Sequence, residues 1–240
     1  MQRYFIDKND INEFKITITN QDVHHMKDVM RFKVNDKVII NTYDGLVYLA
    51  NITTIDKKSV SLELIEEIES KYQPLPLDLG VSLIKKDNFE LILQKTTELG
   101  VKKIIPLSTE RSVIKVDSFD KKSIRYHTIL KEASEQSERT ILPVMGEYTF
   151  LKNLNFNDYK YKLVCFARED SLNIKKELES IKQGEQVLVL IGPEGDFTPK
   201  EMDFLISQGF KSVSLGKTIL RSETAAIYVT SLIRFLLEDN

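Results

Sequence analysis

Two segments in the C-terminal half of the chain constrain its fold most, because each ends an apolar run at a glycine and then opens a helix. They are VLVLIG (187–192) with the following PEGDFTPKEMDF (193–204), and SVSLG (212–216) with the following KTILRSETA (217–225). A short apolar run without a polar face predicts a buried strand. Glycine lets the backbone turn tightly and approach a ligand. The two units predict neighbouring strands whose loops form a cradle, where open α/β sheets usually bind ligands.

The starts of both helices carry capping signals. Thr198 is predicted as the N-cap of the first helix, with Pro199 at its first position and Glu201 completing a capping box. Ser222 is predicted as the N-cap of the second helix, which runs to about residue 237.

Familiar nucleotide-binding motifs do not account for these glycines. Gly216, Lys217 and Thr218 resemble the end of a phosphate-binding P-loop, but that motif needs a glycine where this chain has Lys211. No G-x-G-x-x-G follows a predicted strand, so the dinucleotide-binding fingerprint is missing as well. Taken singly, each glycine is explained by an ordinary turn.

The sequence pattern changes near residue 71, which predicts two domains, residues 1–71 and residues 72–240. Pro74 and Pro76 hold the chain extended between them and end strand pairing.

The first domain is predicted to be a small β domain, because its apolar residues alternate with polar ones. An Asp-Gly pair at 44–45 predicts a hairpin, and one short helix is expected from Asp22 to about Met30. The expected strands lie within FKITIT (14–19), DKVIINTYDGLVYLANI (36–52) and SVSLELIEEI (59–68).

In the second domain, strands alternate with helices, which predicts a parallel α/β domain with helices on its faces. Gly100 is predicted to end the first of these helices as the C′ residue. The expected strands are 77–84, 103–108, 162–167, 187–192 and 212–216, and the expected helices are 88–100, 119–137, 173–182, 198–208 and 222–238.

Composition excludes several classes of protein. The single cysteine, Cys165, excludes an internal disulfide, and it lies in an apolar strand where a buried thiol is the simplest expectation. Three histidines and one cysteine at these spacings do not form an ordinary zinc site, so no metal is expected. No apolar run reaches the ~20 residues of a membrane helix and the N-terminus is polar, so a cytoplasmic protein without a membrane partner is expected.

The net charge of −2 does not suggest nucleic-acid binding, but the charge is unevenly distributed. Between Lys102 and Lys131 there are eight basic and three acidic residues, an excess of five. This segment could meet phosphates, or it could be the solvated face of a helix.

Several motifs together resemble the RsmE-type ribosomal RNA uridine N3-methyltransferases of the SPOUT class. The resemblance covers nearly the whole chain, in the same order. The matching stretches are Arg3-Tyr4-Phe5, HMKDVMR (25–31), TELGVKKIIPLSTERSV (97–113), EASEQSER (132–139), GPEG (192–195) and LGKTILRSETA (215–225).

This resemblance implies a PUA-like β-barrel that contacts RNA, followed by a SPOUT domain with a deep trefoil knot. It also implies S-adenosylmethionine as cofactor, an obligate homodimer, and small-subunit ribosomal RNA or the assembled small subunit as partner. The chain departs from the family pattern at Asp196 and Glu138, where the family usually has glycine, and at Ser222, where it usually has threonine.

Site residues follow from the same resemblance. Arg221 is the first candidate to stabilise negative charge on the uracil carbonyls, and Glu223 or Glu194 could act as a base or orient the substrate. The expected RNA contacts are Arg3, Arg31, Arg111 and Arg139. The expected cofactor contacts are Ile191, Gly192, Pro193, Glu194, Gly195, Leu215, Gly216, Ile219, Leu220 and Ala225.

Two other interpretations stay open. The chain could be a SPOUT methyltransferase that acts on another RNA or on a ribose 2′-hydroxyl. It could also be a non-catalytic RNA-binding protein of ribosome assembly that keeps the fold, which the charged Asp196 in the cofactor loop would favour.

Overall fold

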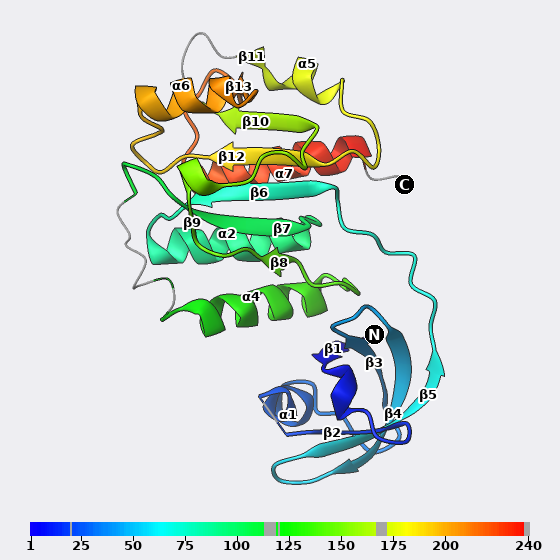
Figure 1. Cartoon of the computed structure of the whole chain (residues 1–240). Coiled ribbons are helices and arrows are strands. Elements are labelled where there is room, and N and C mark those ends of the chain that lie inside the picture. Colours follow the sequence, from blue (N-terminus) through cyan, green and yellow to red (C-terminus); the bar gives the residue numbers. More distant parts are fainter. Residues whose placement is uncertain (20, 113–118, 120, 167–171, 238–240) are drawn as a thin grey trace. The chain divides into compact units, whose positions relative to one another are not determined.

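A computed structural model describes residues 1–19, 21–112, 119, 121–166 and 172–237 (Figure 1). The chain forms two compact units, which are described separately below. The first comprises Met1–Gln73 and Ser134–Leu142, and the second comprises Pro74–Ala133 and Pro143–Asn240. The inclusion of residues 134–142 in the first unit has no counterpart in the sequence pattern.

The first unit is built on a curled five-stranded sheet with the order β1-β3-β4-β5-β2 (Figure 1). Strand β1 pairs in parallel with β3, and the remaining pairs are antiparallel. Gly45, with a φ of +93°, closes the predicted hairpin between β3 and β4. The strands are β1 (Arg3–Ile6), β2 (Lys15–Ile18), β3 (Lys37–Thr42), β4 (Val47–Ile55) and β5 (Val60–Glu67).

The predicted short helix of the first unit is present and has an unusual form. It begins as α1 (Asp22–His24) and continues as a π-helical turn, η2 (His25–Val29). The buried Tyr4 hydroxyl lies 3.0 Å from His25 Nδ1, and burial raises the pKa of Tyr4 above its ordinary value. This hydrogen bond connects His25 of the helix to Tyr4 of β1.

The second unit contains the predicted parallel sheet. Eight strands belong to it, in the order β11-β13-β10-β12-β6-β7-β8 with β9 also paired to β7, and all of these pairs are parallel. The long strands are β6 (Leu77–Ser82), β7 (Lys103–Ser108), β10 (Tyr161–Cys165), β12 (Val187–Ile191) and β13 (Lys211–Ser214). The short ones are β8 (Val144–Met145), β9 (Thr149–Phe150) and β11 (Leu172–Asn173).

Each face of this sheet carries its own core, because alternate side chains of a strand point to opposite faces. Val187, Val189 and Ile191 pack in the core that also includes residues of α2 (Lys86–Glu98), α4 (Ser123–Gln136), α5 (Ile174–Leu178) and α7 (Ser222–Leu237). Leu188 and Leu190 pack in the other core, with α6 (Pro199–Ser207) and η3 (Leu151–Asn153). Burial on both faces explains why the strand sequences are continuously apolar.

Three helices end in the same hydrogen-bonding pattern. In each, the C′ residue donates its N–H to the carbonyl three residues earlier, and the next residue donates to a carbonyl five residues earlier, which defines a Schellman motif. The C′ residue has a positive φ: +95° at Gly100 after α2, +83° at Gly209 after α6, and +59° at Glu138 after α4. The prediction for Gly100 is confirmed. Glu138 occupies a position where glycine is normal, which gives a physical reason for the family's glycine there.

Candidate functional site

The two glycine loops meet at one edge of the parallel sheet. Strands β12 and β13 both pair with β10, and their carboxyl ends point to the same side (Figure 1). The loops enclose a cavity of about 490 Å³. Nine of the ten residues predicted to bind the cofactor line it: Ile191, Gly192, Pro193, Glu194, Leu215, Gly216, Ile219, Leu220 and Ala225.

The glycines of the two loops serve different purposes. A Cβ at Gly192 would lie 3.2 Å from the Phe197 ring and 3.2 Å from Asp196 Oδ1, so a side chain would disturb the packed turn. At Gly216 a Cβ would have no neighbour within 4 Å, but the φ of +136° is one that residues with a Cβ rarely adopt. Its backbone conformation, rather than space, therefore requires glycine. The tenth predicted residue, Gly195, lies outside the cavity lining, and its carbonyl accepts a hydrogen bond from Arg111.

Asp196 completes the first loop in a left-handed conformation, with a φ of +60°. Its N–H donates to the Pro193 carbonyl at 2.9 Å, and its Oδ1 accepts from the Phe197 N–H at 2.9 Å. Aspartate tolerates this conformation better than most residues because its short side chain bonds to the local backbone. The second departure from the family pattern therefore also falls where the backbone favours glycine.

The prediction for Ser222 is wrong in its detail. The Arg221 carbonyl accepts a 2.8 Å hydrogen bond from the Ala225 N–H, so Arg221 holds the N-cap position and Ser222 is the first helical residue. The buried Ser222 hydroxyl instead donates to the Gly192 carbonyl at 2.8 Å. This bond ties the start of α7 to the β12 loop. The Thr198 capping box is confirmed, with Pro199 at the start of α6.

Charged side chains of both signs line the cavity: Glu194, Asp196 and Glu223, and Lys85, Lys217 and Arg221. Arg221 is exposed, whereas Glu223 is buried. Of the apolar residues expected to wall the cofactor, Leu215 and Leu220 pack against the core, but Ile219 is 82% exposed.

Cys165 also lines the cavity and is buried, as predicted. Burial, and secondarily the negative charge of Asp196, raises the pKa of its thiol to about 12. A thiol with such a pKa stays protonated at neutral pH, so it is not a nucleophile.

The Arg111 side chain attaches the loop after β7 to the first glycine loop. Its Nη1 donates to the Gly195 carbonyl at 2.6 Å, while the guanidinium stays exposed. The neighbouring Glu110 N–H donates to Glu201 Oε1 at 2.8 Å, at the start of α6. The family resemblance predicted that Arg111 contacts RNA. The sequence did not predict its hydrogen bond to Gly195, because this bond joins residues far apart in the chain.

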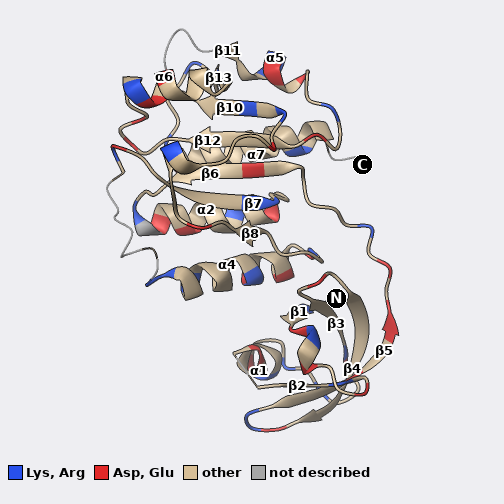
Figure 2. Cartoon of the chain, viewed as in Figure 1, with Lys and Arg blue, Asp and Glu red and all other residues tan. Residues whose placement is uncertain are grey.

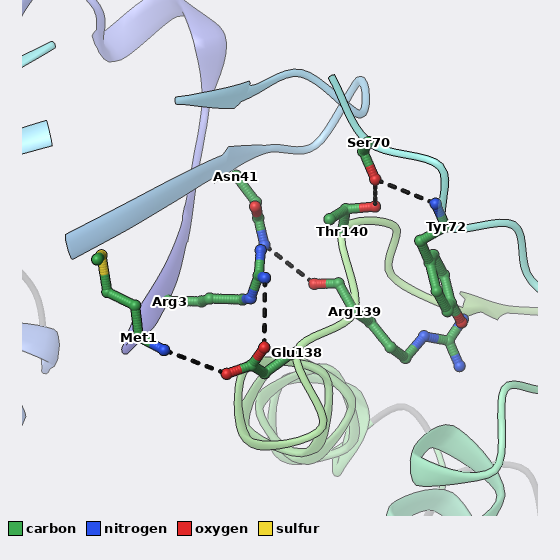
Figure 3. Close-up of polar contacts among 8 residues, drawn as sticks. All are labelled: Met1, Arg3, Asn41, Ser70, Tyr72, Glu138, Arg139 and Thr140. Atoms are coloured by element: carbon green, nitrogen blue, oxygen red, sulfur yellow. Dashed lines mark hydrogen bonds and ion pairs between the residues drawn. The ribbon is translucent and has the colours of Figure 1, made fainter. Parts of the chain in front are cut away.

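In the first unit, two of the predicted RNA contacts lie near the end of α4 (Figure 3). Arg3 pairs with Glu138 at 3.5 Å, and Glu138 also pairs with the N-terminal amine at 3.3 Å. Arg139 is only 2% exposed; its Nε donates to the Ile141 carbonyl at 3.1 Å and its guanidinium lies 5.4 Å from the centre of the Tyr72 ring. The burial of this arginine is consistent with a structural role. Arg31 is exposed, with a φ of +56°.

The basic residues between Lys102 and Lys131 that the structure describes lie at the start of β7, in the loop after it, and in or just before α4. Figure 2 shows basic and acidic residues interspersed along α2 and α4. Arg125 of α4 pairs with Glu90 of α2 at 3.3 Å. Lys115, Asp117 and Asp120, which also entered the prediction, lie outside the described residues.

Neither a metal site nor a membrane span is found in the described part of the chain. No group of three or more histidine, cysteine, aspartate or glutamate side chains there could hold a metal ion. No helix within the described residues combines the length and apolarity needed to cross a membrane.

Comparisons of the sequence with known proteins cover nearly the whole chain. An RNA methyltransferase domain family matches residues 71–234, and an RNA methyltransferase PUA domain family matches residues 18–65. Ribosomal RNA small subunit methyltransferase E of Bacillus subtilis is 35% identical, over 99% of this chain and 98% of that protein. The protein of the same name from Rickettsia conorii is 33% identical, over 98% and 95%.

Solved structures agree with the sequence comparisons. A ribosomal RNA small subunit methyltransferase E from Neisseria gonorrhoeae, bound to S-adenosylmethionine, is 26% identical with a TM-score of 0.85, over 99% of this chain and 98% of that one. A putative methyltransferase from Legionella pneumophila, also in complex with S-adenosylmethionine, is 26% identical with a TM-score of 0.88 and the same coverage.

Proposed function

Since the chain belongs to the ribosomal RNA small subunit methyltransferase E family, we propose that it methylates N3 of a uridine in 16S ribosomal RNA. It is an S-adenosylmethionine-dependent methyltransferase with a PUA-like N-terminal domain and a SPOUT methyltransferase domain. The observation that supports the position of the site is the cavity between the two glycine loops, where Arg221 and Glu223 lie beside the predicted cofactor residues.

The cavity suits the cofactor. Gly192 and Gly216 line it without a side chain, and Leu215 and Leu220 offer apolar surface for an adenine ring. Carboxylates at Glu194, Asp196 and Glu223 can face the positive charges of S-adenosylmethionine. When bound, this cofactor supplies an electrophilic methyl group on a positively charged sulfur.

Arg221 stabilises the nucleophile in this proposal. Uridine N3 carries a proton at neutral pH, and each unit by which its pKa exceeds the pH costs about 1.4 kcal/mol. A guanidinium near the uracil carbonyls stabilises the anion that forms and does not itself titrate. Arg221 suits this role because it is exposed, lines the cavity and ends the second glycine loop.

Glu223 is proposed to orient the substrate or accept the N3 proton, because it lines the same cavity within the first turn of α7. The remaining contribution of the protein is positional: the loops must hold nucleophile and methyl group in line. Ser222 supports that geometry through its bond to the Gly192 carbonyl.

We assign RNA contacts to the exposed Arg31 and Arg111, and to Arg3, which keeps part of its side chain at the surface. Arg139 is assigned instead to positioning the segment after α4, because its guanidinium is buried. Both free RNA and the assembled small subunit are compatible with this proposal as substrates.

We further propose that the enzyme is a homodimer that associates through α7. Large apolar side chains are exposed on or near this helix: Ile219 (82%), Tyr228 (42%), Phe235 (85%) and Leu236 (46%). An apolar surface of this kind usually marks an interface. It flanks a cavity of about 590 Å³ that shares Leu215 and Gly216 with the cofactor site, so a partner would lie beside the cofactor loop. The trefoil knot remains a prediction.

The test of the proposed function is methyl transfer from labelled S-adenosylmethionine to small ribosomal subunits that lack the modification, followed by nucleoside digestion and mass spectrometry. The expected product is 3-methyluridine. A 2′-O-methylated nucleoside would refute the substrate assignment and leave the methyltransferase assignment in place. Absence of transfer together with absence of cofactor binding in calorimetry would refute the assignment of the site.

A further inference from the structure

A second cavity of about 400 Å³ lies at the carboxyl end of β7, beside β9 and the start of α6. All of its lining residues belong to the second unit. Its volume is within the range of about 300–1,000 Å³ typical of ligand sites. The side chains that characterise it are two phenylalanines, Phe150 and Phe204, and two lysines, Lys152 and Lys200. Neither the cofactor nor the predicted RNA contacts account for it.

The two phenylalanine rings are held by other aromatic rings. Phe150 is 49% exposed, and its ring centre lies 6.3 Å from that of Tyr148, which in turn stacks on Phe119. Phe204 lies 6.1 Å from Phe156. Leaving an aromatic ring half exposed forgoes hydrophobic stabilisation, which a ligand that covers Phe150 recovers.

Two exposed lysines at the cavity can contact an anion. Lys152 and Lys200 are exposed, and Lys200 lies in the first turn of α6, where the helix dipole adds positive potential. The carboxylate of Glu201, which also lines the cavity, accepts hydrogen bonds from the N–H groups of Glu110 and Thr198. These donors stabilise the carboxylate and hold it at the start of α6, so the two glutamates are countered by two lysines, and the exposed lysines are the groups that can reach a phosphate.

This cavity shares a structural element with the cofactor site. The segment from Pro193 through α6 lines both: Pro193, Glu194 and Asp196 face the cofactor cavity, while Lys200 and Phe204 face the second one. The loop after β7 is bonded to the same segment through Arg111 and Glu110. The two cavities are therefore lined by neighbouring residues of one segment of the chain.

We propose that the second cavity binds an unpaired nucleotide of the substrate RNA close to the methylated one. Its base stacks on Phe150, and Lys152 and Lys200 contact the adjoining phosphates. Aromatic stacking recognises single-stranded RNA because every base has an aromatic face. This inference rests on the proposed function, because it extends the RNA path away from the reacting uridine.

The test compares binding of a fluorescent, unmodified 16S ribosomal RNA fragment by anisotropy. Phe150→Ala is expected to weaken RNA binding about 5- to 150-fold, since one stacked base contributes that much. Phe150→Trp should restore it. Lys152→Ala and Lys200→Ala should each make the dependence of the logarithm of the binding constant on the logarithm of the salt concentration less steep by about 0.7, the contribution of one phosphate of a single strand. Ile206→Ala, a comparably exposed residue of α6 outside the cavity, is the matched control and should bind normally.

Calorimetry with S-adenosylmethionine separates this inference from the proposed function. Unchanged cofactor affinity in Phe150→Ala, with weakened RNA binding, supports the second cavity. If Phe150→Ala binds RNA as tightly as the wild type, the inference is overturned. It is also overturned if the variant loses cofactor affinity in parallel, because Phe150 would then have a structural role. A switch from dimer to monomer in Phe150→Ala would also overturn it, because the cavity would then contact a second copy. A wild-type protein that binds cofactor but no RNA would refute the proposed substrate as well.

Discussion

Replacing Glu138 with glycine should stabilise the protein relative to replacing it with alanine, the reverse of the usual order. At an ordinary position alanine is more stabilising than glycine by about 0.4–1 kcal/mol, because it restricts the unfolded chain. Glu138, however, is the C′ residue of the Schellman motif after α4, with a φ of +59°. A left-handed conformation costs any residue with a Cβ about 1–2 kcal/mol.

The magnitude follows from these opposing terms. Glycine avoids the cost of the left-handed conformation, and this gain is larger than the stability lost because glycine leaves the unfolded chain less restricted. Glu138→Gly should therefore be more stable than Glu138→Ala by roughly 0.5–1 kcal/mol. Both variants lose the ion pairs of Glu138 with Arg3 and the N-terminal amine (Figure 3). The Glu138 side chain is 58% exposed, so the two pairs together contribute only about 0–1 kcal/mol. Glu138→Gly should therefore equal the wild type or exceed it slightly.

The dependence of stability on pH provides a second measurement. A hydrogen bond from the N-terminal amine, followed by its charge and that of Arg3, lowers the pKa of Glu138 below its ordinary value of 4.5. A carboxyl with a lowered pKa stabilises the folded state above its unfolded pKa, and this contribution disappears as the pH falls through the folded pKa. The stability of Glu138→Gly relative to wild type should thus increase below about pH 4.5.

The assay is urea denaturation followed by circular dichroism, with free energies of unfolding from linear extrapolation. Gly209→Ala provides the reverse control, because Gly209 holds the same C′ position after α6 with a φ of +83°. A Cβ there would meet only the end of the Lys162 side chain, at 3.4 Å, so its cost is conformational. Gly209→Ala should destabilise. Equal or greater stability of Glu138→Ala than of Glu138→Gly would refute the argument.

Three further predictions concern the candidate active site. Arg221→Ala should lower kcat about 10²- to 10³-fold with little change in cofactor affinity by calorimetry, and a parallel loss of cofactor binding would contradict the assigned role. Ser222→Ala leaves the buried Gly192 carbonyl without its donor and should cost about 1–3 kcal/mol in urea unfolding, whereas Ser222→Thr should keep the bond. The thiol of Cys165 has a pKa of about 12 in the folded protein, against an ordinary value of 9.0, so the free energy of unfolding should fall as the pH rises above 9. The Cys165→Ala variant should lose less stability over the same range. Identical pH profiles of the variant and the wild type would refute this prediction.

Local patterns predicted much of the fold. Continuous apolar runs identified the long strands of the parallel sheet, since each strand is buried on both faces. Capping signals located the start of α6 and the end of α2, because a capping box and a C′ glycine act over a few residues. The short strands β8, β9 and β11 were missed, since two residues carry no periodicity.

The glycine loops could be located from the sequence, because a loop and the strand before it are adjacent in sequence. Nine of the ten predicted residues line the cavity. The family's glycines at 138 and 196 have a local cause too, a left-handed backbone that this chain adopts with Glu138 and Asp196.

The tertiary structure alone decided which distant side chains meet. Ser222 bonds to Gly192 across 30 residues, and Arg111 bonds to Gly195 across 84. Arg139, which was predicted to contact RNA, is buried with its guanidinium beside the Tyr72 ring. Sequence periodicity reports which face of an element is apolar, but not which other element covers that face or which polar groups it brings together. Those pairings form only when segments that are distant in the sequence pack against one another. The second cavity forms in the same way, because Phe150 and Lys200 come from different elements.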